Sequence, residues 1–286
     1  MSDARILDRG YRRFEGTRSG VIGAMRSVAW HTARSILGLG RTARHKVFPI
    51  IVMVIAFVPA IAFVAISVLL KGFGDELRPD YWEFFQYSFV ATIVFVALVA
   101  PEAIVRDRRD GMFALYLSTP LSRLTYVVAK VVAVLSTMAL VVLGPPVLWF
   151  LGYTFQSQGP DGLLGWLGVA ARLLVAGLVI CAVYTAVSLG VASMTSRRAF
   201  ASIAVVFVVV GGAIVTDLLV NVAERSESWR VLDPLGLALE VAPRLFGDRS
   251  DDFRAVGTWQ VALGCLGWAG SGVGLLTLSF RGRAAV

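Results

Sequence analysis

The sequence has little charge for its length. Of its 286 residues only 16% are charged, whereas 57% are hydrophobic, and the mean hydropathy is +0.75. Soluble domains carry about 25% charged residues. The composition therefore excludes an ordinary soluble protein and predicts an integral membrane protein.

Cysteine, histidine and the common catalytic motifs are equally scarce. Cys181 and Cys265 fall within apolar runs, which predicts neither a disulfide framework nor a thiolate metal site. His31 and His45 have no carboxylate or cysteine at ligand spacing. The chain also lacks a GxxxxGK[ST] phosphate loop, an HExxH zinc motif and a GxSxG elbow. We expect no metal site, no cofactor and no enzymatic activity on this chain, so any nucleotide chemistry belongs to another chain.

What the sequence does have is a series of apolar runs long enough to cross a bilayer, which takes about 20 residues each. They predict an all-α protein with six transmembrane helices at 46–70, 85–105, 123–151, 168–193, 199–220 and 258–280. We expect a cytoplasmic tail and interfacial helix at 1–45 and a transmembrane domain at 46–286. The outer connector, 221–257, is too short for an independent domain of about 50 residues or more. Its apolar segment 231–246 is predicted to dip back into the outer leaflet.

The basic residues indicate the orientation, because short loops rich in Lys and Arg stay cytoplasmic. Most of the 27 Lys and Arg fall in 1–46, 106–123, 197–198 and 281–283, whereas the outer connectors are rich in Asp and Glu. This predicts a multi-pass protein of a cell membrane, bacterial by preference, with both termini cytoplasmic. The net charge of +8 is then a topology signal, and no nucleic-acid partner is expected.

The segment before the first run, 20–42, repeats apolar side chains at helical spacing, with arginines off that stripe. This pattern predicts an amphipathic helix along the cytoplasmic interface. The alternative is a basic tail held loosely by anionic lipid. The layout is not that of a cleaved signal peptide, so the first run is expected to remain as a span.

The connector between the second and third runs is basic and amphipathic. Asp110 is placed to cap a short helix whose Met112, Phe113, Leu115 and Tyr116 would fill a cleft on a partner. The alternative is an ordinary inside loop whose basic residues follow the topology rule and whose apolar residues touch lipid. The residue pattern alone leaves both open.

The run EAIVRDRRDGMFALYLSTPLSRLTYVVAK at 102–130 resembles the signature of ABC type-2 permeases, the membrane subunits of a class of ATP-driven exporters. In that family a segment of the form E-[RD]-x-x-G-x-x-x-x-x-L-x-x-[PS]-[LI]-S-R, followed by Lys, forms the first coupling helix. The layout is similar too, with an N-terminal elbow helix, six spans, a short second inner loop at 195–199 and a longer outer connector. Asp107 departs from the pattern, since the family has Glu there.

The resemblance implies a permease subunit that binds two cytoplasmic ATPase subunits, which hold ATP and Mg, and a second permease chain in a homodimer or heterodimer. Closure of the ATPases would push on the coupling helix and rock the spans. The residues assigned to this coupling are Arg108, Arg109, Asp110, Gly111, Met112, Phe113, Leu115, Pro120, Arg123, Arg197 and Arg198. Spans with so few charges, surrounded by membrane lipids, favour export of a small amphipathic or hydrophobic compound. A permease-like scaffold for assembly or sensing is the alternative.

Charges and small residues within the spans carry the remaining predictions. Glu102 is expected near the inner interface as a structural partner of Lys130 or Arg123 rather than as a substrate ligand. Pro49 and Pro59 in the first run, and Pro145 and Pro146 in the third, predict kinks. A small-residue face in the last span predicts close helix packing within the subunit, or alternatively dimerisation, through Gly264, Gly267, Ser271 and Gly274.

Overall fold

The computed structural model describes residues 19–40, 42–69 and 79–281, apart from the side chains of residues 44, 45, 100, 113, 114, 117 and 281. Within these ranges the chain is almost entirely helical and contains no strand. The all-α class is therefore confirmed.

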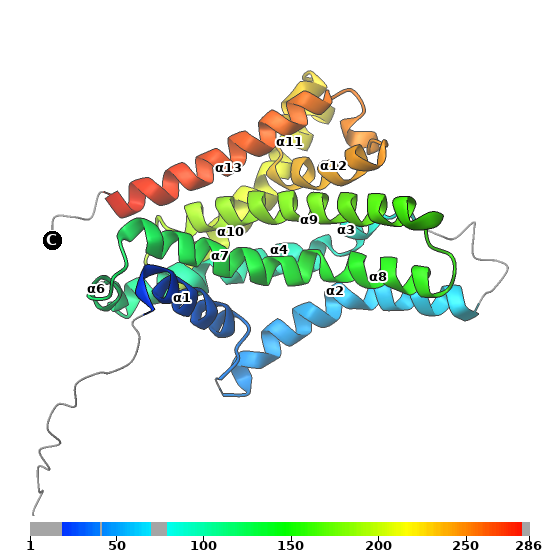
Figure 1. Cartoon of the computed structure of the whole chain (residues 1–286). Helices are drawn as coiled ribbons and strands as arrows, with labels where there is room; N and C mark the ends of the chain where they lie inside the picture. Colours follow the sequence, from blue (N-terminus) through cyan, green and yellow to red (C-terminus); the bar gives the residue numbers. More distant parts are fainter. Residues whose placement is uncertain (1–18, 41, 70–78, 282–286) are drawn as a thin grey trace, which may run out of the picture.

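The elements follow one another along the chain as a continuous series of helices (Figure 1). In order they are α1 (Gly20–Ile36), α2 (Arg44–Leu69), α3 (Glu83–Tyr87), α4 (Phe89–Ala100), η1 (Pro101–Val105), α5 (Arg106–Arg109), α6 (Met112–Leu117), α7 (Arg123–Val142), α8 (Gly144–Phe155), α9 (Gly162–Ala192), α10 (Arg198–Val206), η2 (Phe207–Gly211), α11 (Gly212–Asp217), η3 (Leu218–Val222), η4 (Glu227–Leu232), α12 (Pro234–Phe246), η5 (Asp251–Phe253) and α13 (Thr258–Arg281).

Six helical stretches in the described part of the chain are long and apolar enough to cross a membrane. They are Lys46–Leu69, Phe89–Arg109, Arg123–Val142, Gly162–Ala192, Arg198–Val222 and Thr258–Phe280. Each overlaps one predicted run, so the apolar composition located all six. This arrangement fits a multi-pass membrane protein.

The helices form an elongated bundle with α9 at its centre (Figure 1). α9 packs against α13, α12, α7, α10 and α4, while α2 packs on α8 and α4, and α1 packs on α7. The core runs along α9, where Cys181, Tyr184 and Leu189 are buried. Cys181 and Cys265 are both buried and free.

The third predicted run, 123–151, is not one straight helix. α7 ends at Val142, and α8 begins at Gly144 with Pro145 and Pro146 in its first turn. Proline is tolerated there because the first backbone N–H groups of a helix have no intrahelical partner. The predicted kink is thus a break between two helices.

The segment 231–246 was predicted to dip into the outer leaflet, without a packing partner. In the structure this segment packs against other helices. α12 packs on α9 and α13 and buries Leu237, Ala238 and Ala242. Glu240 is fully buried and pairs with Arg244 Nε at 2.6 Å, and Arg244 also donates to the carbonyl oxygens of 253 and 256 at 2.8 Å each. α12 is therefore a helix of the bundle, held by packing, an ion pair and hydrogen bonds.

The predicted small-residue face of the last span is only partly used. Gly264 packs on Val231 and Leu237, but a Cβ added to Gly267 or Gly274 would meet nothing within 4 Å. The close approach lies on another face, where Gly272 of α13 touches the backbone of Ala186 on α9 and Gly190 faces Gly272. The tight helix contact is therefore made within the chain, by glycines that the predicted stripe missed.

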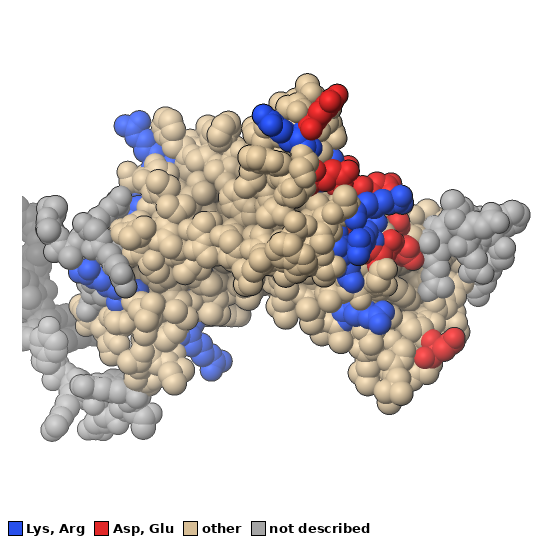
Figure 2. Space-filling model, turned by 90° about the horizontal axis from the view of Figure 1, so that it is seen from above, with Lys and Arg blue, Asp and Glu red and all other residues tan. Residues whose placement is uncertain are grey.

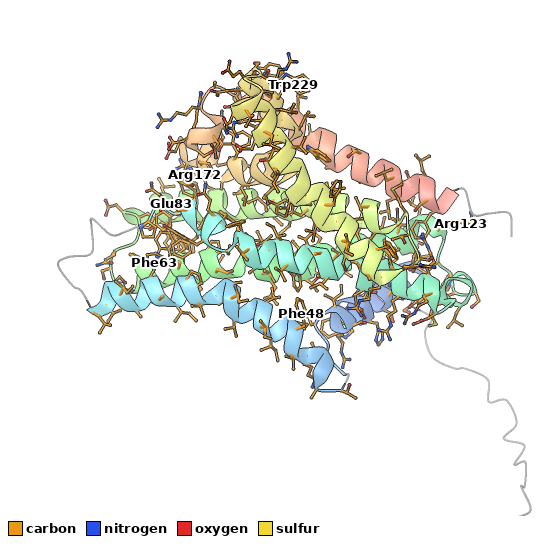
Figure 3. The ribbon with its side chains drawn as sticks, turned by 180° about the vertical axis from the view of Figure 1, so that it is seen from behind. Phe48, Phe63, Glu83, Arg123, Arg172 and Trp229 are labelled. Carbon is orange, nitrogen blue, oxygen red and sulfur yellow. The ribbon has the colours of Figure 1, made fainter. Side chains whose placement is uncertain are left out.

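The two ends of the bundle differ in charge. On the face shown in Figure 2, acidic residues gather at one end, whereas only Lys and Arg show at the other. Figure 3 places Arg123 at the basic end and Glu83, Arg172 and Trp229 toward the opposite end. The charge asymmetry seen in the sequence is thus an asymmetry of the folded molecule.

Candidate functional site

The connector of residues 106–120 meets four other parts of the chain at the basic end of the bundle. It follows a π-helical turn, η1, that begins at Pro101. Proline supplies no N–H and its ring clashes with the preceding turn, which disrupts regular α-helical bonding there. Such π turns are frequent at functional sites. Charged and polar residues form the contacts that hold the connector, and we call this group of residues the junction. It comprises Thr32, Ser35, Glu102, Arg106, Asp107, Arg108, Lys130, Ser193 and Arg198.

Glu102 is the first centre of the junction, and it is 9% exposed. Its Oε1 accepts a hydrogen bond from Arg106 Nη1 at 3.2 Å, and its Oε2 lies 3.1 Å from Arg198 Nη1. The sequence predicted Lys130 or Arg123 as the partner; the structure instead pairs Glu102 with Arg106 and Arg198. Glu102 therefore joins the second span to the start of α10.

Asp107 and Lys130 form the second centre. Lys130 Nζ lies 2.6 Å from Asp107 Oδ2 and donates to Thr32 Oγ1 at 2.9 Å, while Tyr126 donates to Asp107 Oδ2 at 2.9 Å. Lys130 is 3% exposed, and a buried ammonium group requires such partners. Its Nζ also lies 5.8 Å from the ring centre of Tyr116, which is within cation–π range. These contacts tie α5 to α7 and α1.

Two arginines complete the attachment of α5. Arg106 Nη1 donates to Ser35 Oγ on α1 at 2.9 Å. Arg108 Nη1 donates to the carbonyl oxygen of Ser193, just after α9, at 2.6 Å, and its guanidinium lies 5.6 Å from the ring centre of Phe280 on α13. Arg108 was predicted to contact an ATPase, yet its half-buried side chain is engaged inside the chain. We therefore assign Arg108 to the junction.

The outward side of the connector is carried by other predicted residues. Arg109 is 67% exposed in its side chain, and Leu115 is 59% exposed. Asp110 pairs with Arg109 at 3.2 Å and with Arg106 at 3.5 Å. Gly111 has a φ of +65°, a conformation that glycine adopts at little cost, and it separates α5 from α6. The Phe113 side chain lies outside the described residues.

The other predicted coupling residues lie around the outward side of the connector. Met112 is half-buried beside the junction, and Pro120 is exposed in the turn before α7, which Ser122 caps. Arg123 and Arg197 are exposed, and the guanidinium of Arg197 lies 5.8 Å from the ring centre of Phe200. Only Arg198 reaches the buried part of the junction, through Glu102.

A polar cavity of about 240 Å³ lies within the junction. It is lined in part by Thr32, Glu102, Asp107 and Lys130. Burial, and then the charge of Asp107, raises the pKa of Tyr116 at its wall. Among the described residues no group of three His, Cys, Asp or Glu side chains is arranged to hold a metal. The cavity is a place where helices are held together by paired charges.

Sequence reasoning missed the partners that the connector finds. Thr32 and Ser35 lie on the face of α1 that also buries Val28 and Ile36. The one signal available was a pair of polar residues on an otherwise apolar helix face. Ser193 gave no signal, because its contribution is a backbone carbonyl.

No protein-family model matches the chain, and no curated protein matches it.

Proposed function

We propose that this chain is the permease subunit of an ABC transporter that exports a small amphipathic or hydrophobic compound across a cell membrane. A separate pair of ATPase subunits would bind ATP and Mg, and a second permease chain would complete the pathway. One observation carries the proposal. A short amphipathic connector at the basic end exposes Arg109 and Leu115 while its inner side is ion-paired to several helices.

A force applied to the connector would reach the helices of the bundle through the contacts of the junction. Asp107 transmits displacement of α5 to α7 through Lys130, and Arg108 transmits it to the end of α9. Glu102 links the same segment to α10 through Arg198. Breaking one member of a buried pair costs about 3–5 kcal/mol. When an ATPase subunit pushes on the connector, moving the attached helices together therefore costs less free energy than breaking these pairs. This is the motion of rigid-body alternating access.

The orientation follows from the same end of the molecule. By the positive-inside rule we expect the basic end to lie in the cytoplasm, where ATP is available. The apolar outer faces of the candidate spans, such as Ile50, Ile61 and Ile214, would lie against lipid or a second permease chain.

A photo-crosslinker at Leu115 tests the predicted partner. The chain carrying it is expressed in its native cells, irradiated and purified, and captured proteins are identified by mass spectrometry. We expect an ATP-hydrolysing subunit to be captured. The same crosslinker at Trp229, which is 46% exposed at the opposite end, is the matched control and should capture none. Capture of no ATP-hydrolysing protein at Leu115 would contradict the proposal.

Charge reversal at Arg109 tests coupling. Arg109→Glu should leave the spans folded, since the side chain is 67% exposed, but should lower substrate-stimulated ATP turnover of the purified complex in nanodiscs. Arg225→Glu, an exposed change in the outer connector, should leave that turnover unchanged. A complex that hydrolyses ATP at the same rate with every compound tested would favour the scaffold function over export.

A further inference from the structure

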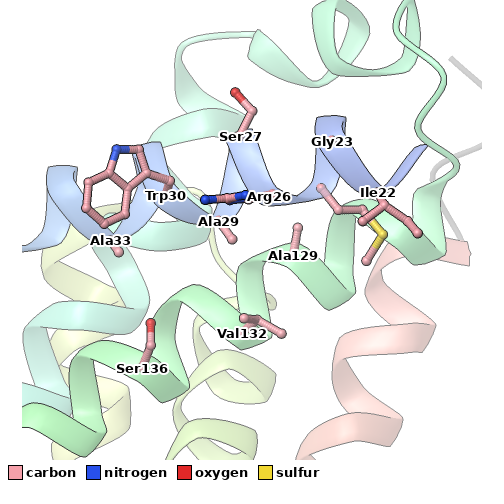
Figure 4. A pocket seen from close by; sticks show the side chains of 11 residues that line it. Ile22, Gly23, Arg26, Ser27, Ala29, Trp30, Ala33, Ala129, Val132 and Ser136 are labelled. Carbon is pink, nitrogen blue, oxygen red and sulfur yellow. The ribbon is translucent and has the colours of Figure 1, made fainter. Parts of the chain in front are cut away.

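A groove of about 860 Å³ runs between α1 and α7, separate from the polar cavity of the junction (Figure 4). Its volume falls within the range of about 300–1,000 Å³ found for small-molecule sites. α1 forms one wall and α7 the other. Its lining includes Ile22, Arg26, Trp30, Ala33, Val132 and Ser136.

The groove is open because short side chains line it. Gly23, Ala29 and Ala33 of α1 face Ala129 and Ser136 of α7. The two helices are held at a fixed spacing on the neighbouring face, where Val28 packs with Tyr126 and Thr32 accepts the hydrogen bond from Lys130. The helices therefore leave a trough that their own side chains do not fill.

The walls of the groove are apolar apart from two serines, Ser27 and Ser136, and one cation, Arg26. Ile22 is 81% exposed and Trp30 is 61% exposed, so no protein covers them among the described residues. Arg26 lies between them on α1, and no acidic residue lines the groove. In the part of the chain that the structure describes, Arg26 forms no ion pair, in contrast to Arg106 and Arg198 of the junction.

We propose that this groove binds one anionic phospholipid of the cytoplasmic leaflet. An acyl chain lies along Val132 between α1 and α7, and the phosphate pairs with the Arg26 guanidinium, a charge-assisted contact. Tryptophan prefers the depth at which lipid head groups begin, which matches Trp30 beside Arg26. The bound lipid holds α1 against α7, and α1 supplies Thr32 and Ser35 to the junction.

The proposal rests on the membrane insertion in the proposed function but not on an ATPase partner. The test therefore uses the purified full chain alone. Native mass spectrometry counts the lipids retained, and a titration with phosphatidylglycerol or phosphatidylcholine of identical acyl chains gives each Kd. We expect the wild-type chain to bind phosphatidylglycerol more tightly than phosphatidylcholine.

Two variants separate the head-group contact from the acyl-chain contact. Arg26→Gln should weaken phosphatidylglycerol binding about tenfold, equivalent to about 1.4 kcal/mol, and leave phosphatidylcholine binding unchanged. Ala33→Leu fills the trough and should abolish retention of both lipids. Ser136→Leu fills it from α7 and replaces Ala33→Leu if that chain does not fold. Arg225→Gln removes an exposed arginine from the outer connector and should change neither Kd.

Three results would overturn the proposal. In the first, Arg26→Gln and Arg225→Gln have equal effects. In the second, both filling variants retain the wild-type number of lipids. In the third, the filling variants change the oligomeric state and leave the lipid count intact, which would assign the groove to a second copy of the chain. If one of these results is obtained while the crosslinker at Leu115 still captures an ATPase, the lipid proposal fails and the proposed function stands.

Discussion

The residues that matter most individually are the charged side chains buried at the basic end. Lys130 is almost fully buried, and Asp107, Thr32 and the Tyr116 ring surround its Nζ. Asp107 in turn accepts from Tyr126. Removal of one partner leaves the other charge buried without compensation, which is far more costly than the loss of an exposed pair.

Lys130→Met should therefore destabilise the chain by about 3–5 kcal/mol, because it leaves Asp107 unpaired. The double variant Lys130→Met with Asp107→Asn should recover part of this loss, because no charge is then left alone. Thermal unfolding of the purified chains in one detergent measures both. Arg109→Gln, at an exposed position, should stay within about 0.5 kcal/mol of wild type. Equal losses for Lys130→Met and Arg109→Gln would show that the pair is unimportant.

At the scale of elements, α9 and α13 approach closely because two glycines meet. Gly190 and Gly272 bring the helix backbones together, and a Cβ on Gly190 would lie 2.7 Å from the Cα of Gly272. Close backbone approach increases packing between helices that gain no hydrophobic driving force within lipid. The glycines thus fix the distance between the central and last helices.

Gly272→Ala should destabilise the chain by about 1–3 kcal/mol, since the added methyl overlaps the backbone of Ala186. Gly267→Ala is the matched control on the same helix, where the new methyl meets nothing within 4 Å. It should be neutral or stabilising, because alanine favours a helix over glycine by about 1 kcal/mol. Unfolding midpoints in detergent compare the two. Similar losses in both variants would contradict the packing assignment.

α12 begins at a partly buried cap. The Asp233 side chain accepts from the backbone N–H of Leu235 at 2.8 Å. Burial raises the pKa of Asp233, and the backbone N–H groups of Gly236 and Leu235 oppose that rise only in part. The fold therefore prefers the protonated acid. This preference stabilises the fold below the pKa that Asp has in the unfolded chain, and the stabilisation is lost as the pH rises through the folded pKa.

Asp233→Asn keeps the cap without the charge, so its stability relative to wild type should rise between about pH 4 and pH 7. Asp233→Ala loses the cap and should cost about 1 kcal/mol across this range. Unfolding midpoints at a series of pH values, taken as differences from wild type, test both statements. If the unfolding midpoint of Asp233→Asn, relative to that of wild type, fell as the pH rises, the raised pKa of Asp233 would be contradicted.

At the scale of the whole molecule, the two ends differ in charge and in construction. The basic end holds the junction and the connector, whereas acidic side chains gather at the other end with the tied helix α12 (Figure 2). This asymmetry predicts one orientation in a membrane. The short turn between α9 and α10 and the segment before η4 then lie on opposite sides.

Single cysteines test this orientation, since Cys181 and Cys265 are buried. Ser228→Cys, near the acidic end, should react with a membrane-impermeant maleimide in intact cells. Ser196→Cys, in the turn before α10, should react only after permeabilisation. Both serines are exposed and both changes are small. Labelling of Ser196→Cys in intact cells, with protection of Ser228→Cys, would invert the topology.

The sequence located the helices but not their rotation about their own axes. Apolar run length placed all six candidate spans, and proline placed the break before α8. Helical spacing predicted α1 and most of its inner face. The direct ion-pair partners of Glu102, Arg106 and Arg198, were not predicted, because several basic residues lie near that interface and the rotation of each helix decides which one it meets. The small-residue stripe through Gly267 failed for the same reason.

By itself, the sequence determined the all-helical class, the positions of the spans and the charge difference between the two ends, because these depend on composition and on periodicity along one segment. Only the tertiary structure decided that Arg108 faces inward while Arg109 faces outward, and that Asp107 pairs with Lys130. It also decided that α1 and α7 leave a groove beside Arg26. These features need two segments distant in the chain at a defined distance and rotation, and helix packing sets both.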